Sequence, residues 1–321
     1  MNFSKDDKMD KIKIGVIGTG YWGKKHVFEY SQLKEAELSW ICDLDKSLLK
    51  TLSKDHNIPN ITTNYKDVLE SDVKAVSICS NNENHYKLAK EALLAGKHVL
   101  LEKPMTTSSK TSQDLVNIAK KAKRQLAVGH IFRFNDGLSE VKKLIKKGYF
   151  GDIYFLRLQW TTVLNPKNPI DVILDLCPHT FDIMNYLLDE WPIKITCTGK
   201  AYRKKNLEDV AFIMAEFKNG ICAHTEVSWL LPGKVRELYV IGSKRSANVE
   251  CLSQKVLVFE NGKEINLNIT ANNTIASELS HFLDSIKKGS TLSNDGEIGT
   301  KTLQLIEASK ESLKKGKTIE I

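Results

Sequence analysis

The sequence predicts an α/β protein of two domains, a doubly wound parallel sheet followed by an α+β domain with an open, mostly antiparallel sheet. With 321 residues, the chain exceeds the size at which a single core usually keeps growing. Up to about residue 130, short runs that are apolar throughout alternate with helical runs, as in a parallel sheet covered on both faces. Beyond that point the expected strands are longer and mix polar with apolar residues, so we expect the boundary near residues 130–136.

In the first half, the apolar pattern predicts strands at 12–17, 38–43, 75–79, 98–101 and 125–129, and helices at 22–33, 46–56, 85–95 and 108–123. We expect this first domain to span 12–131. A polar extension, 1–11, precedes it and lacks the apolar stretch of a signal peptide.

In the second half, 132–321, a helix is expected at 138–147 and strands at 153–160, 193–201, 210–217, 221–229, 238–241 and 256–260. Helices are expected at 276–287 and 296–314. Asn219-Gly220 and Asn261-Gly262 predict hairpin turns, because both dipeptides readily adopt positive φ.

The composition restricts the class of protein. Lys and Arg outnumber Asp and Glu by 47 to 39, a net charge of +8, which suits an anionic small substrate, simple solubility or a nucleic acid. The basic residues are spread out without interleaved aromatic residues, which disfavours the nucleic acid. No run of 18 apolar residues predicts a membrane span. Six cysteines show no metal-ligand spacing and are expected to be reduced, as in a cytoplasmic protein: Cys42, Cys79, Cys177, Cys197, Cys222 and Cys251.

A glycine-rich turn follows the first expected strand and opens a helix, the context that a dinucleotide fingerprint requires. Gly18 permits the tight turn, Gly20 lets the backbone approach the pyrophosphate, and Gly23 lets helix and strand pack closely. Asp43, twenty residues after Gly23, ends the second strand, where an acid binds the adenosine ribose. The predicted cofactor-binding residues of the turn are Gly18, Thr19, Gly20, Tyr21, Trp22 and Gly23.

The cofactor is expected to be NAD rather than NADP. The Asp43 carboxylate would repel a 2′-phosphate, and Leu44 and Asp45 supply no cation, although Lys46 offers one.

A polar loop, Ser80 to His85, follows the strand at 75–79, at the edge of the sheet where α/β proteins bind ligands. It has two interpretations: Ser80 or Asn82 contacts the cofactor, or Asn84 caps the helix at 85–95.

Two clusters suggest proton chemistry. Lys103 follows the strand at 98–101 between Glu102 and Pro104; alone, Glu102-Lys103 is more typical of a surface ion pair. Asp175 lies four residues before His179, ahead of an expected helix at 180–188. Histidine has a pKa suited to moving a hydroxyl proton, and a carboxylate can orient it. The alternatives are a helix-capping histidine and a turn carboxylate.

Together the glycine turn, the run from Ala95 to Pro104, the stretch from Val128 to Asn135 and the Asp175/His179 pair resemble the Gfo/Idh/MocA oxidoreductase family over nearly the whole chain. The resemblance implies a Rossmann domain, a second α/β domain built on an open sheet, oligomers packed through that sheet, and oxidation or reduction at a sugar or cyclitol carbon. It also implies site roles. Lys103 and His179 would flank the reacting hydroxyl, and Asp175 would assist them. Glu102 and Lys103 would contact the cofactor, and Ser80, Asn82 and His85 would occupy the family's Thr-Pro-Asn-x-x-His loop.

The chain departs from the family pattern in two places. Asn81 replaces the proline of the loop and Ser80 its threonine. Many relatives have glycines before and between the aspartate and the histidine, where this chain has Asp171-Val172-Ile173-Leu174 and then Cys177-Pro178. This affects the expected backbone near His179.

The substrate is expected to be a sugar, and the stretches around Arg133 and Lys234 are most similar to the branch that oxidises the 3-hydroxyl of UDP-linked N-acetylhexosamines. Lys234, Arg236 and Arg133 would then pair with phosphate or carboxylate oxygens. A solvated basic hairpin is the alternative for Lys234 and Arg236, and a free sugar or inositol the alternative substrate. A non-catalytic NAD and sugar sensor is the rival from another class. A homodimer or homotetramer through the C-terminal sheet is expected.

Overall fold

The computed structural model describes residues 11–166 and 169–321, which form two compact units. Unit 1 holds residues 11–105, 113–129 and 275–296, and unit 2 holds 106–112, 130–274 and 297–321. Residues 1–10, which form most of the expected polar extension, lie outside the described residues, and so does the prediction that this extension is not a signal peptide.

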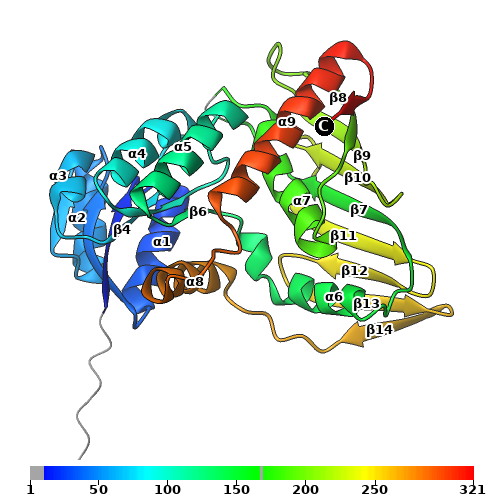
Figure 1. Ribbon diagram of the computed structural model, residues 1–321, viewed down its shortest axis with the longest axis horizontal. Coiled ribbons are helices and arrows are strands. Elements are labelled where there is room, and N and C mark those ends of the chain that lie inside the picture. The colour runs from blue at the N-terminus through cyan, green and yellow to red at the C-terminus, as the bar shows by residue number, and fades with distance from the viewer. Residues whose placement is uncertain (1–10, 167–168) are drawn as a thin grey trace, which may run out of the picture. The chain divides into compact units, whose positions relative to one another are not determined.

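Unit 1 is built on a six-stranded parallel sheet of order β3-β2-β1-β4-β5-β6, which confirms the doubly wound prediction (Figure 1). Its strands are β1 (Ile12–Ile17), β2 (Ala36–Cys42), β3 (Asn60–Thr62), β4 (Ala75–Ile78), β5 (His98–Leu101) and β6 (Leu126–Val128). The helices between them are α1 (Tyr21–Gln32), α2 (Lys46–His56), α3 (Tyr65–Glu70), α4 (Asn82–Leu94) and α5 (Ser109–Ala122).

The prediction was wrong at two places in this half. The short elements β3 and α3 were not predicted, since each is too short and too polar to show a period. Helix α4 begins at Asn82 with Asn81 at its N-cap, so Asn84 lies inside the helix and does not cap it.

Helix α8 (Thr274–Lys288) packs in the core of unit 1, although it follows the whole second sheet in sequence. Its buried side chains Leu279, Phe282 and Leu283 join one cluster with Ile14 and Val27. The helix expected at 276–287 was assigned to the second domain, because an amphipathic pattern does not indicate which core its apolar stripe packs against.

Unit 2 is built on a nine-stranded sheet of order β14-β13-β12-β11-β7-β10-β9-β8-β15. Every pairing is antiparallel except that of β7 with β10, which confirms the mostly antiparallel prediction. The strands are β7 (Ile153–Thr161), β8 (Lys194–Lys200), β9 (Val210–Glu216), β10 (Cys222–Ser228), β11 (Val235–Gly242), β12 (Ser246–Glu250), β13 (Lys255–Glu260), β14 (Lys263–Leu267) and β15 (Ile319–Glu320). Three strands that are short or polar were not predicted: β12, β14 and β15.

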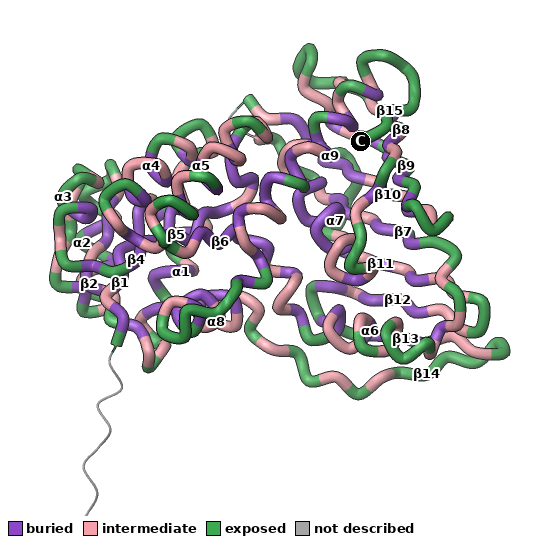
Figure 2. The backbone as a smooth tube through the Cα atoms, in the orientation of Figure 1, coloured by how far each residue is buried: buried purple, intermediate pink, exposed green. Residues whose placement is uncertain are grey.

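One face of this sheet is covered by helices. The helices of unit 2 include α6 (Asp136–Lys146), α7 (Val172–Leu188) and α9 (Gly296–Lys315). Helix α7 packs on β7, β9 and β10, and α6 packs on β12 and β13. Along these strands, buried residues alternate with less buried ones (Figure 2). Because successive side chains of a strand point to opposite faces, the buried set shares the face on which the helices pack. Both predicted Asn-Gly turns join neighbouring antiparallel strands.

All six cysteines are free, and four of them, Cys42, Cys177, Cys197 and Cys251, are buried.

Candidate functional site

The glycine turn after β1 has the geometry that a dinucleotide needs. Gly18 has a φ of +86°, and its N–H donates to the Cys42 carbonyl at 2.8 Å. A Cβ on Gly23 would lie 1.9 Å from the Gly18 carbonyl oxygen, so helix α1 can approach β1 only without a side chain there. A Cβ on Gly20, in contrast, would meet no atom within 4 Å. No side chain caps α1, so its first N–H groups are directed at open space where a phosphate fits.

Asp43 lies at the end of β2, and the turn orients its carboxylate. The backbone N–H and the hydroxyl of Thr19 donate to Oδ2 at 2.6 and 3.0 Å, and the N–H of Asp45 donates to Oδ1 at 3.1 Å. Burial acts to raise the pKa of Asp43, but these hydrogen bonds outweigh it and lower the pKa below its usual value. The carboxylate is therefore ionised and retains acceptor capacity for ribose hydroxyls.

A cleft of about 360 Å³ joins these features. Its lining residues come from the ends of β1, β2 and β4 and the start of α4: they include Gly18, Gly20, Asp43, Ser80, Asn81, Asn84 and Lys87. The predicted residues Gly18, Gly20, Asp43 and Ser80 are thus brought together, whereas Asn82 and His85 do not line the cleft. The uncapped helix, the glycine space and the ionised acid fit NAD.

His85 is instead fully buried between two carbonyl groups. Its Nδ1 lies 2.9 Å from the Pro104 oxygen and its Nε2 lies 3.0 Å from the Ser80 oxygen. Burial lowers the pKa of His85, against the opposing effect of the two carbonyls, so the ring is neutral at neutral pH. A neutral imidazole has one N–H and donates to one of these oxygens at a time.

Lys103 follows β5, and its neighbour Glu102 is buried. Glu102 is not a surface ion-pair partner: its Oε1 lies 3.1 Å from Nε2 of His26 on α1, and its Oε2 accepts the N–H of Lys103 at 3.1 Å. A Cβ on Gly129 would lie 2.9 Å from Oε2 of Glu102, which explains the glycine there.

Asp175 and His179 both lie within α7, one turn apart on the same side of the helix. The predicted helix at 180–188 was therefore too short, and the capping role considered for His179 and the turn role considered for Asp175 are wrong. Asp171 caps α7, accepting the N–H of Leu174 at 2.8 Å. His179 is 7% exposed, and its ring packs edge-on against Phe132 with centroids 5.1 Å apart.

Arg236, on β11, points into unit 2. It is 7% exposed, and one guanidinium nitrogen donates to the carbonyls of Thr161 and Val235 at 2.9 and 2.7 Å. Burial lowers the pKa of Arg236 to about 10, with Asp175 acting in the opposite direction. The interpretation as a solvated hairpin is thus wrong for Arg236, while Lys234 is exposed.

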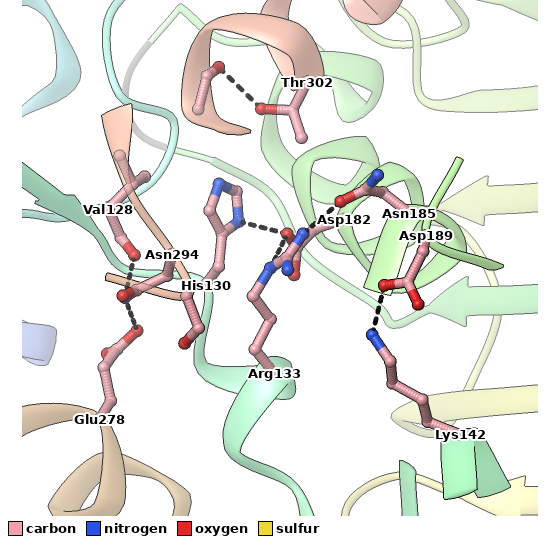
Figure 3. A network of polar contacts seen from close by, with 12 residues as sticks. Val128, His130, Arg133, Lys142, Asp182, Asn185, Asp189, Glu278, Asn294 and Thr302 are labelled. Atoms are coloured by element: carbon pink, nitrogen blue, oxygen red, sulfur yellow. Dashed lines mark hydrogen bonds and ion pairs between the residues drawn. The ribbon is translucent and has the colours of Figure 1, made fainter. Parts of the chain in front are cut away.

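Arg133 is held inside unit 2 by α7 (Figure 3). Its Nε donates to Asp182 at 2.6 Å, and a terminal nitrogen donates to Asn185 at 2.7 Å. Nδ1 of His130 lies 3.9 Å from the same Asp182 oxygen. Because these partners occupy one edge of the guanidinium, Arg133 is engaged by the protein itself.

In the part of the chain that the structure describes, no helix has the length and apolar character needed to cross a membrane. Within residues 11–166 and 169–321, no group of three or more His, Cys, Asp or Glu side chains is arranged to hold a metal ion.

A Rossmann-type parallel sheet with a cleft of this geometry defines an NAD-binding protein. Residues 12–130 match the description "Oxidoreductase family, NAD-binding Rossmann fold", and residues 138–248 match "GFO/IDH/MocA C-terminal domain". The chain belongs to the Gfo/Idh/MocA oxidoreductase family.

Two curated relatives cover nearly the whole chain. UDP-N-acetylglucosamine 3-dehydrogenase of Acidithiobacillus ferrooxidans is 24% identical over 309 residues, 92% of this chain and 95% of that protein. Myo-inositol 2-dehydrogenase of Thermotoga maritima is 24% identical over 331 residues, 97% of this chain and 98% of that protein.

Solved structures share the fold. That of the A. ferrooxidans dehydrogenase has a TM-score of 0.86 at 23% identity and covers 95% of this chain and 98% of its own. An oxidoreductase from Agrobacterium radiobacter in complex with NAD⁺ has a TM-score of 0.88 at 20% identity and covers 97% of this chain and 98% of its own.

Proposed function

We propose that the protein is an NAD-dependent dehydrogenase or reductase that acts at a ring carbon of a sugar, with a nucleotide-linked sugar of the UDP-N-acetylhexosamine type, at its 3-position, as the first candidate. The observation that carries the proposal is the Asp175/His179 pair on α7 of a chain whose Rossmann unit carries Lys103 two residues after the end of β5. Bound NAD would supply the hydride acceptor. A pure sensor of NAD and sugar needs neither an imidazole nor a lysine at these positions.

The proposed roles follow from the side chains. The imidazole of His179 takes the hydroxyl proton during oxidation and returns it during reduction, while Asp175 orients the ring or stabilises its protonated form. The Lys103 ammonium polarises the substrate oxygen. The Asp175 carboxylate acts to raise the pKa of Arg236, so the proposed role of Arg236 changes from binding phosphate to supporting this carboxylate.

Arg236 is buried and Arg133 is engaged by Asp182 and Asn185, so Lys234 is the exposed member of the predicted phosphate-binding set. What supports a nucleotide-linked sugar is therefore the relative of that activity, which matches 92% of this chain. The inositol dehydrogenase, which matches 97%, supports a free sugar or cyclitol as the second candidate.

The test is a substrate panel. UDP-sugars, free sugars and inositols are offered with NAD⁺ while nicotinamide absorbance is followed, and His179→Gln is compared with His56→Gln, a histidine that bonds Ser31 in unit 1. Turnover of a UDP-sugar that is lost in His179→Gln and kept in His56→Gln supports the proposal. Tight binding of a sugar without turnover by the unaltered protein would favour the sensor.

We also propose a homodimer or homotetramer that packs through the open face of the nine-stranded sheet. That face exposes Phe155, Phe212 and Met214, and α6 and α7 cover the opposite face. Exposed apolar side chains grouped on one sheet face are typical of an interaction surface. A cytoplasmic location is proposed because all six cysteines are free.

A further inference from the structure

Lys103 lies in a short segment that two buried histidines contact from different helices of unit 1. His26 comes from α1 and reaches Glu102, the residue before Lys103. His85 comes from α4 and reaches the carbonyl of Pro104, the residue after it. Both histidines have no exposed surface. Neither imidazole lines the nucleotide cleft, so neither is placed to contact NAD there.

The contact of His26 is transmitted to the Lys103 backbone through one carboxylate. Glu102 is 4% exposed, and a buried carboxylate without donors is strongly disfavoured. One of its oxygens faces Nε2 of His26 at 3.1 Å, and the other accepts the N–H of Lys103 at 3.1 Å. Gly129 allows the carboxylate this position, since a Cβ there would overlap it. Loss of the His26 donor would leave Oε1 of Glu102 buried without this partner. That cost favours a turn of the carboxylate, which would displace the oxygen that holds the Lys103 N–H.

We propose that His26 and His85 are positioning residues for Lys103, fixing its segment through the Glu102 carboxylate on one side and the Pro104 carbonyl on the other. This rests on the proposed function only in that Lys103 contacts the substrate. Helices α1 and α4 begin at the glycine turn and at the Ser80 loop, two of the loops that line the nucleotide cleft. The same two helices thus connect the cofactor loops to the catalytic lysine.

The two histidines use different ring nitrogens, which allows a crossed test. The side-chain amide of asparagine reaches about as far as Nδ1, and that of glutamine about as far as Nε2. His26 contacts Glu102 through Nε2, and its Nδ1 has no hydrogen-bond partner among the described residues, so His26→Gln keeps the contact and His26→Asn loses it. His85 contacts Pro104 through Nδ1 and Ser80 through Nε2. His85→Asn therefore keeps the Pro104 contact and loses the Ser80 contact, and His85→Gln does the reverse.

Three measurements are made on the full chain: kcat with the best substrate of the panel, the Kd for NAD by calorimetry, and the NMR signal of ¹³C-methylated Lys103, assigned by its absence in Lys103→Arg. His26→Asn and His85→Gln should lower kcat at least about tenfold and shift the Lys103 signal, because small displacements of a reacting group are costly. His26→Gln and His85→Asn should keep kcat within about twofold and the signal in place. The Kd for NAD should stay unchanged in all four.

The proposal is overturned if asparagine and glutamine behave alike at both positions, or if His85→Asn weakens NAD binding while the lysine signal stays in place. The NMR signal needs no substrate. If the panel yields none, the proposed function fails while the signal still decides on the two histidines. Each histidine forms its own pair, so a variant that does not fold leaves the other pair as the test.

Discussion

Two aspartates that lie two residues apart, Asp43 and Asp45, should have separable roles. In Asp43→Ala, NAD loses hydrogen bonds from its ribose to an ionised acceptor, worth about 1.5–3 kcal/mol. Because Asp43 is only partly buried, the lower part of that range applies, a Kd increase of roughly 10- to 30-fold at about 1.4 kcal/mol per factor of ten. NADP should lose less or gain, since the repulsion of its 2′-phosphate disappears.

Asp45→Ala is the matched control. Its carboxylate caps α2, accepting the N–H groups of Ser47 and Leu48 at 2.9 and 3.0 Å. Its loss should reduce the free energy of unfolding by about 1 kcal/mol and leave the Kd for NAD within about twofold. Calorimetric titration and urea unfolding of both variants decide the matter. An Asp43→Ala protein that binds NAD as well as the unaltered protein would refute the assignment of the ribose acceptor.

Three further outcomes are expected. Lys103→Met and His179→Gln should each lower kcat by about 10² or more and leave the Kd for NAD unchanged, because positioned proton transfer contributes a factor of that size. Normal turnover of His179→Gln would mean that the His179 ring only packs in the core. Burial lowers the pKa of His98 to about 4. Folding therefore favours the neutral form of His98. The contribution of this group to the free energy of unfolding is fully present above the unfolded pKa of about 6.5 and is lost as the pH falls toward 4. His98→Asn should flatten that decline in urea titrations, and an equally steep decline would contradict the reasoning. Phe212→Lys combined with Met214→Lys should produce monomers in sedimentation experiments, and an unaltered sedimentation coefficient would exclude this face.

Helices and strands with strong apolar runs could be predicted from the sequence. Those whose local signal is overridden by tertiary burial could not. Helix α7 is the clearest case. A proline inside a helix lowers its stability by about 3 kcal/mol, so the helix was predicted to begin after Pro178, at residue 180. In the structure, the buried side chains of Val172, Ile173 and Leu176 offset that cost, and the helix starts two turns earlier.

In the site, the residues at strand ends were predictable because topology brings those ends together. The inward position of Arg236 was also detectable, since Arg236, Leu238 and Val240 share one face of a strand by period two. His26 lies on the buried stripe of α1, which marks it as an unusual polar core residue. Its partner was not predictable, because the two residues lie 76 positions apart and only the folded unit brings them together.

Helix α8 imposes an order on the synthesis of this protein. The first 129 residues leave the ribosome before Leu279, Phe282 and Leu283 exist, yet these three side chains belong to the same core. Each contributes roughly 1.5–3 kcal/mol when buried, a large share of the net stability of a domain. Until the nascent chain reaches residue 283, the core of unit 1 lacks these three side chains, and the apolar surface that they cover stays exposed. The sheet of unit 2 is translated in that interval, so the domain that begins the chain is the one whose folding must wait.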